Sequence, residues 1–413
     1  MSGSFAFKVL QRDAKTAARR GQMTTPHGLV ATPAFMPVGT AGTVKAMTPQ
    51  DLAALGFEMI LGNAYHLALR PGEEIVRRLG GLHRFMAWEG SILTDSGGFQ
   101  VLSLVDRASI SDEGVAFRSH LDGSLLAMTP ERSLKIQEGL GSDIVMAFDD
   151  CPPLPAARER LLDAVRRTSL WARRSREAFP ADGRAVFGIV QGGDDRGLRE
   201  RSAGEITAMG FDGYAIGGVS VGESAERSRS IVAMTAPLLP DDRPRYLMGM
   251  GTPADLVEMM ALGCDLFDCV LPTRNARNGM LFTANGRLQI KRSEFAEDPR
   301  PVDSSCGCPV CSRFSRAYLR HLYVAREILS MRLNTLHNLY RYADVMRRAR
   351  AAIEAGRYAE FLAEFRARGT SAGEGAPEGE GAAGRDVPSR PDGDREPRGT
   401  RRRPGPIAGR RSQ

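Results

Sequence analysis

The feature that most constrains the fold of this chain is a series of short apolar segments between about residues 31 and 271. Continuous apolar strands of this kind are typical of a sheet that is buried on both faces, as parallel sheets are. The segments that we expect to form strands are residues 31–38, 57–63, 91–95, 143–150, 185–193, 213–218, 245–251 and 264–271.

Helical segments separate most of these strands. Residues 129–141 begin with Thr-Pro-Glu and end at a glycine, residues 252–263 have the same pattern, and both predict well-capped helices. Residues 155–179 predict a longer amphipathic helix with a basic outer face. Alternating strands and helices over about 240 residues predict an α/β protein with a (β/α)8 TIM barrel. A doubly wound open sheet contains the same βαβ units and is the alternative.

Polar residues at the strand ends favour the barrel over the open sheet. Asp95, Asp149, Asp150, Gln191 and Asp268 all lie at or near the carboxyl end of a predicted strand. In a barrel these ends converge on one mouth, where active sites form.

Two segments interrupt the alternation and predict hairpins, because each has an Xaa-Gly turn, Asp122-Gly123 or Asn285-Gly286. Helical segments follow at 316–356 and 361–368. From Gly369 onward the chain is nearly free of large apolar residues, and we expect disorder. We therefore expect a barrel domain (1–278), a subdomain that contains a cysteine cluster and C-terminal helices packed on the barrel (279–368), and a disordered tail (369–413).

Charge and targeting signals restrict the partners and the compartment. The formal net charge of +7 favours polyanionic partners. No apolar run approaches the roughly 20 residues that cross a bilayer. The first residues contain no sustained apolar segment of the signal-peptide type, so we expect a cytoplasmic protein without a membrane partner.

Three cysteines predict a metal site. Cys306, Cys308 and Cys311 lie within one short stretch that contains Gly307 and Pro309. Three thiolates and one imidazole fill the tetrahedral shell of a structural zinc ion, so we expect one Zn2+ per subunit. Spacing alone leaves the fourth ligand open, and the alternatives are His337, His321 and His27.

Two of the carboxylates point to glycosyl transfer. Asp268 interrupts an otherwise apolar strand, where a carboxylate is costly unless it is paired or functional. Asp95 is followed by two glycines in Asp95-Ser96-Gly97-Gly98 and could also be a helix cap. Two carboxylates at one barrel mouth can act as nucleophile and acid/base in transfer at a sugar carbon.

Several sequence blocks, taken together, carry a resemblance to a known family. In order along the chain they are GNAYHL (62–67), TDSGGFQVLSL (94–104), AFDDCPP (147–153), GIVQGG (188–193), GGVSVGE (217–223), YLMGMGTP (246–253), FDCVLPTRNARNG (267–279) and the cysteine cluster with its distant histidine. Over roughly residues 5–365, this combination resembles the bacterial tRNA-guanine transglycosylases.

The resemblance implies a reaction and its catalytic residues. Members of this family exchange guanine at the wobble position (34) of tRNAs with GUN anticodons (Asp, Asn, His, Tyr) for a 7-deazaguanine, in queuosine biosynthesis. Asp268 matches the nucleophile that forms a covalent enzyme–RNA intermediate, and Asp95 matches the general acid/base. His337 matches the fourth zinc ligand. The family also implies a homodimer.

The resemblance further implies how the base and the RNA are bound. Val221 matches the valine of enzymes that use preQ1, which favours preQ1 as the incoming base. Arg274 and Arg277 match arginines that contact phosphates. The expected substrate-binding residues are Asp95, Ser96, Phe99, Asp149, Gln191, Gly218, Val219, Val221 and Met248. Two other readings stay open: a non-catalytic subunit that binds tRNA, and a barrel glycosidase of small nucleosides.

Overall fold

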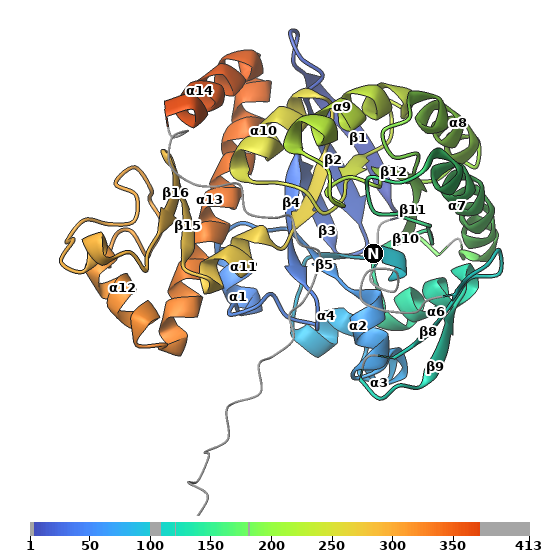
Figure 1. Ribbon diagram of the computed structural model, residues 1–413, viewed down its shortest axis with the longest axis horizontal. Coiled ribbons are helices and arrows are strands. Elements are labelled where there is room, and N and C mark those ends of the chain that lie inside the picture. The colour runs from blue at the N-terminus through green and yellow to red at the C-terminus, as the bar shows by residue number, and fades with distance from the viewer. Residues whose placement is uncertain (1–3, 100–108, 120, 181, 372–413) are drawn as a thin grey trace, which may run out of the picture. The chain divides into compact units, whose positions relative to one another are not determined.

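Eight parallel strands close into a barrel in the order β10-β11-β12-β13-β14-β4-β5-β6 (Figure 1). The computed structural model describes residues 4–99, 109–119, 121–180 and 182–371. Each of the eight predicted segments overlaps one barrel strand, so the TIM barrel is confirmed and the open sheet is excluded. The strands are β4 (Ala34–Gly39), β5 (Met59–Gly62), β6 (Ser91–Thr94), β10 (Ile144–Met146), β11 (Ala185–Val190), β12 (Gly213–Ile216), β13 (Arg245–Leu247) and β14 (Leu266–Cys269).

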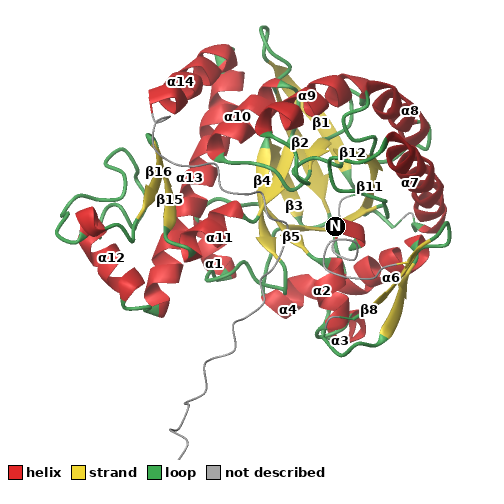
Figure 2. Cartoon of the chain, in the orientation of Figure 1, coloured by secondary structure: helices red, strands yellow, loops and turns green. Residues whose placement is uncertain are grey.

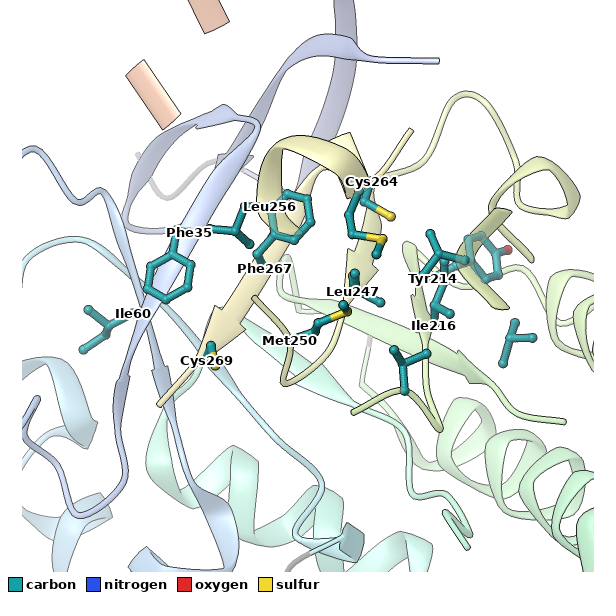
Figure 3. Close-up of a cluster of buried hydrophobic side chains, with 14 of the residues drawn as sticks. Phe35, Ile60, Tyr214, Ile216, Leu247, Met250, Leu256, Cys264, Phe267 and Cys269 are labelled. Atoms are coloured by element: carbon teal, nitrogen blue, oxygen red, sulfur yellow. The ribbon is translucent and has the colours of Figure 1, made fainter. Parts of the chain in front are cut away.

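Successive side chains of each strand point alternately into the barrel and toward the helices, as the pleat of a strand requires. On β14, Leu266 belongs to the buried cluster inside the barrel, whereas Phe267 and Cys269 pack in the layer beneath the helices. Figure 3 shows these two side chains among others of that outer layer. This alternation assigns Asp268 to the interior face of β14, near its carboxyl end.

Helices surround the barrel (Figure 2). The predicted helices at 129–141, 155–179 and 252–263 are confirmed as α6, α7 and α10, and Thr129 and Thr252 cap the first and the last. The described helices before residue 280 are α1 (Pro49–Ala54), α2 (Ala64–Leu69), α3 (Glu73–Arg78), α4 (Gly81–Met86), α6 (Pro130–Leu140), α7 (Arg158–Ala178), α8 (Arg196–Thr207), α9 (Ala225–Thr235), α10 (Pro253–Ala261) and α11 (Leu271–Arg277). Short 3-10 turns are η1 (Ala236–Leu238) and η2 (Ser293–Phe295).

An antiparallel sheet at the amino end of the barrel was not predicted. It consists of β1 (Ala6–Arg12), β2 (Arg19–Thr25) and β3 (Gly28–Thr32). The strand expected at 31–38 begins later, as β4 at Ala34, because residues 31 and 32 belong to β3 and the nitrogen of Pro33 between the two strands donates no hydrogen bond to a ladder. Met23 and Val30 of this sheet share the buried cluster of the barrel interior, so the sheet closes that end.

Both predicted hairpins are present. The first is β8 (Val115–Arg118) paired with β9 (Leu125–Met128), with β7 (Ser109–Ile110) as a third strand, and the second is β15 (Met280–Thr283) with β16 (Gly286–Gln289). The predicted C-terminal helices are confirmed as α12 (Arg316–Val324), α13 (Ile328–Glu354) and α14 (Tyr358–Ser371).

The C-terminal helices are attached to the barrel through buried tyrosines. The hydroxyl of Tyr342 on α13 donates to the carbonyl of Gly251 at 2.8 Å, and that of Tyr358 donates to Val257 at the same distance. Helix α14 continues past Gly369, and the remainder of the predicted tail lies outside the described residues. None of the helices in the described ranges has both the length and the hydrophobicity of a membrane span.

Candidate active site and metal centre

Asp268 is held at the interior face of the barrel by two neighbours. The hydroxyl of Tyr246 and the backbone amide of Gly249 both donate to its Oδ1 at 2.7 Å. Among the described residues, these two bonds leave Oδ2 without a donor. Burial raises the pKa of Asp268 above its usual range, while the bonds from Gly249 and Tyr246 act in the opposite direction.

Asp95 directly follows β6 and is 7% exposed. The amide of Asn63 donates to its Oδ2 at 2.6 Å, and the backbone amide of Ala64 donates to its Oδ1 at 2.8 Å. Burial raises the pKa of Asp95 to about 7, and the charges of Asp268 and Asp149 contribute to this rise. Asp149 and Asp268 therefore lie close enough to Asp95, at the barrel mouth, for their charges to affect it.

Asp149 follows β10 and pairs with the other predicted polar residue. The Nε2 of Gln191 donates to Asp149 Oδ2 at 2.8 Å, and Ser96 Oγ lies 3.5 Å from Oδ1. Burial raises the pKa of Asp149 to about 6, whereas the Gln191 bond lowers it. Asp150 points elsewhere and is buried against Arg160 and Arg167 of α7, so it is a structural residue.

The loop after β12 carries three of the expected base-binding residues. Gly218 and Val219 are buried, and Val221 is half-buried. The carboxylate of Glu223 accepts hydrogen bonds from the backbone amides of Ser220 and Val221. Gly218 has a φ of +65°, in the region that favours glycine.

The two expected stacking residues and the two arginines are half-buried. Phe99 follows the glycines after Asp95, and Met248 follows β13 and packs against the barrel-interior cluster. Arg274 and Arg277 lie on α11, directly after the strand of Asp268, and their spacing places them on one helix face.

Sequence reasoning missed the residues that hold the carboxylates. Asn63 and Tyr246 donate to Asp95 and Asp268, and Glu223 holds the β12 loop. Asn63 and Tyr246 lie inside GNAYHL and YLMGMGTP, two of the blocks that resemble the family. Each places a polar side chain beside an apolar strand, and this is the sequence signal that could have identified them.

The cysteine cluster and His337 converge on one point. The Nδ1 of His337 lies 3.4 Å from the sulfurs of Cys308 and Cys311 and 4.0 Å from that of Cys306. On the opposite side of the ring, Nε2 lies 2.8 Å from the carbonyl of Phe282, to which it can donate, so Nδ1 is free to present a lone pair. These four residues could hold a metal ion.

The two other candidates for the fourth metal ligand, His321 and His27, do not lie at the cysteine cluster. His321 is exposed on α12. His27 and His83 both contact the carboxylate of Asp143, at 2.6 and 3.1 Å, with their rings stacked at 3.5 Å and 11°. Because a ring nitrogen presents its lone pair in the ring plane, nearly parallel rings do not aim at a common ion. We interpret this group as a polar contact at the amino end of β10.

The fold and the two sites define a class: a TIM-barrel enzyme with buried carboxylates at the barrel mouth and a separate Cys3His group. The family model described as queuine tRNA-ribosyltransferase matches residues 13–371. The queuine tRNA-ribosyltransferase of Nitratidesulfovibrio vulgaris (strain DP4) is 57% identical over 85% of this chain and 94% of its own length.

Relatives from other bacteria agree. The queuine tRNA-ribosyltransferase of Cereibacter sphaeroides (strain ATCC 17029 / ATH 2.4.9) is 53% identical over 89% of this chain and 97% of its own length. That of Thiobacillus denitrificans (strain ATCC 25259 / T1) is 54% identical over 87% and 98%. The chain belongs to the queuine tRNA-ribosyltransferase family. It is a pentosyltransferase of the tRNA-guanine transglycosylase type, and its substrate is tRNA.

Proposed function

We propose that the chain exchanges guanine 34 of tRNAs with GUN anticodons for preQ1, by double displacement, as a cytoplasmic step of queuosine biosynthesis. The observation that carries this proposal is the position of two buried carboxylates at the barrel mouth, Asp95 directly after β6 and Asp268 on β14, and the charge of Asp268 contributes to the raised pKa of Asp95. The family and its relatives supply the tRNA and the base.

Asp268 is the nucleophile in this proposal. Its Oδ1 is occupied by Tyr246 and Gly249, so Oδ2 attacks C1′ of the guanosine and the bond from C1′ to the base breaks. Asp95 gives its proton to the leaving guanine and then takes a proton from the incoming base. That base attacks C1′ and displaces Asp268, so two displacements retain the configuration at C1′.

The base is bound between Phe99 and Met248, because a base removed from its stack is held by apolar or aromatic faces. Asp149 accepts from the pyrimidine edge, and Gln191 and the amide of Gly218 donate to the exocyclic oxygen. The carbonyl of Val219 accepts from the aminomethyl group of preQ1, beside Val221. Ser96 supports Asp149 from 3.5 Å.

Arg274 and Arg277 neutralise phosphates next to the reacting nucleotide. Their place on α11 puts both side chains immediately after the strand of the nucleophile. A formal net charge of +7 supports a polyanionic substrate, whose affinity should fall steeply as salt rises.

The metal of the Cys3His group is a structural zinc ion. Zinc–sulfur and zinc–nitrogen bonds of about 2.3 and 2.0–2.1 Å in a tetrahedron separate sulfur from nitrogen by about 3.6 Å. The 3.4 to 4.0 Å between Nδ1 and the three sulfurs brackets this value. Zinc bound by Cys306, Cys308, Cys311 and His337 would tie the loop of residues 306–311 to α13 in the 279–368 subdomain.

The protein forms a homodimer through the α12–α13 region. Here Val324, Ile328 and Met331 are 57%, 81% and 42% exposed, and they lie within eight residues of one another. A cluster of exposed apolar side chains is typical of a protein interface.

Exchange of the base tests this function. The zinc-loaded protein is incubated with unmodified tRNA bearing a GUN anticodon and labelled guanine, and acid-precipitable label is counted. We expect label in the tRNA, and we expect preQ1 to compete with it. No incorporation by the folded protein would favour a non-catalytic tRNA-binding subunit. Release of free base without incorporation would favour a hydrolase.

A further inference from the structure

Arg199 of α8 is a fully buried cation at the edge of the barrel mouth. Its side chain donates to three backbone carbonyls: Nε to Gly193 at 2.8 Å, and Nη1 to Val190 at 3.0 Å and Gly217 at 2.8 Å. Burial lowers the pKa of Arg199 to about 10, so the group stays charged at neutral pH. In the described part of the chain, Nη2 has no hydrogen-bond partner.

These bonds hold the backbone at the carboxyl end of β11, through Val190 and Gly193, and directly after β12, through Gly217. The peptide between Val190 and Gln191 is held at both groups, because its carbonyl accepts from Arg199 and its amide donates to Ser202 Oγ at 3.0 Å. Ser202 lies on the same helix, α8. The main chain that carries Gln191 is therefore set by two side chains of one helix.

The second fixed peptide joins Gly217 and Gly218. Its carbonyl accepts from Arg199. The carbonyl and amide of a trans peptide point in opposite directions, so this bond directs the Gly218 amide away from Arg199. On that side lies Cys151. Burial raises the pKa of its thiol to about 12, and the Gly218 amide that faces it acts in the opposite direction.

The side-chain amide of Gln191 packs on this same peptide. A Cβ on Gly217 would lie 2.5 Å from Gln191 Nε2, and one on Gly218 would lie 2.7 Å from Oε1. The buried Oε1 has no hydrogen-bond partner among the described residues. The two groups, the Gln191 amide and the Gly218 amide, are thus adjacent, and both depend on the backbone that Arg199 holds.

Stability alone does not account for a charged group here. A buried cation is costly unless a carboxylate pairs with it, and an apolar side chain of similar volume often serves stability as well. Among the described residues, Arg199 donates to carbonyls and not to a carboxylate.

We infer that Arg199 is a positioning residue for base recognition, which aligns the Gln191 and Gly218 donors with the exocyclic oxygen of the purine. This inference rests on the proposed function of these two donors.

Equilibrium binding of two bases to Arg199→Met tests this role. Guanine carries the exocyclic oxygen, and 2-aminopurine lacks both that oxygen and the N1 proton, so for each base the variant is compared with the wild-type protein. We expect the Kd of guanine to rise about tenfold, as for loss of one or two well-aligned hydrogen bonds. The Kd of 2-aminopurine should change less than about twofold. The matched control is Arg201→Met on the exposed face of α8, where Arg201 pairs with Glu205, and both Kd values should stay at wild-type level.

Equal loss of affinity for both bases would overturn the inference and make Arg199 a general structural residue. Unchanged affinity for guanine would overturn it as well. If Arg199→Met is not recovered folded, Arg199→Lys supports the same comparison, because an ammonium group cannot reach all three carbonyls in one plane. Failure of the proposed function is distinct, since the wild-type protein would then bind guanine yet incorporate none into tRNA.

Discussion

The two proposed catalytic carboxylates differ in what surrounds them. Asp268 accepts two hydrogen bonds on one oxygen from Tyr246 and Gly249, and such bonds favour the charged form. Burial raises the pKa of Asp95 to about 7, with help from the charges of Asp268 and Asp149. A carboxyl group with this pKa can both give and take a proton near neutral pH. The raised pKa of Asp95 agrees with a protonated acid, and at Asp268 burial raises the pKa while the two hydrogen bonds to Oδ1 act in the opposite direction.

The raised pKa of Asp95 gives a pH-dependent contribution to stability. The folded protein holds this proton up to about pH 7, whereas an unfolded aspartic acid side chain loses it near its ordinary pKa of 3.8. The folded state therefore loses stability relative to the unfolded state as pH rises from about 4 to 7. In Asp95→Asn this contribution is absent. We expect the variant to gain stability relative to wild type by up to about 4 kcal/mol across this range.

Urea unfolding of both proteins at a series of pH values measures this difference. It should grow between pH 4 and 7 and then level off. A difference that stays constant from pH 4 to 8 would contradict the raised pKa. Titratable groups that are present in both proteins and do not interact with Asp95 cancel in the comparison.

At the level of elements, the loop of residues 306–311 lies against His337 of α13, and we expect a zinc ion to link this loop to the helix. In Cys308→Ser one thiolate is lost, so metal content should fall below about half an ion per chain, since three ligands bind a structural zinc much more weakly than four. The melting temperature should fall with it, because metal binding contributes to folding.

Metal analysis and thermal unfolding of the purified variant check this expectation. Cys264→Ser is the control, because Cys264 is buried outside the cluster, and this variant should keep its zinc. Full metal content in Cys308→Ser would contradict the proposed ligand set.

The elements that sequence predicted are those with a local signature. Buried parallel strands are continuous apolar segments, and α6 and α10 begin at threonine-proline caps. Strands β1 and β2 escaped prediction because AFKVLQR and RRGQMTT mix charged and apolar residues. These two strands are stabilised by contacts with segments that are distant in sequence, such as the buried ion pair of Arg19 with Asp265.

The same distinction applies to the site. Asp268 was predictable because an acid inside an apolar strand is conspicuous. Tyr246 and Asn63 act across neighbouring strands, and no local pattern shows which carboxylate they will meet. Arg199 lies in a polar helix and resembles its exposed neighbours Arg196 and Arg201 in sequence, although it alone of the three is buried.

For the whole molecule, the exposed apolar residues of the α12–α13 region predict a dimer. A charge at the most exposed of them, in Ile328→Glu, should separate the subunits, because an unpaired carboxylate would be buried in the interface. Sedimentation should then give 44.8 kDa in place of twice that mass.

Leu125→Glu is the matched control, since Leu125 is 71% exposed on the β8–β9 hairpin, far along the chain. That variant should remain a dimer. A wild-type protein that sediments as a monomer would contradict the proposed assembly, and a dimeric Ile328→Glu would place the interface elsewhere.

In the proposed mechanism, Asp268 forms a covalent bond to the tRNA, while Asp95 gives a proton to the leaving base and takes one from the incoming base. The most direct measurement is a denaturing gel of the protein after incubation with tRNA. We predict a denaturation-resistant protein–RNA band for wild type and no such band for Asp268→Asn, with tRNA affinity kept within about twofold because the amide is nearly the same size. A band of wild-type intensity in Asp268→Asn would exclude Asp268 as the nucleophile.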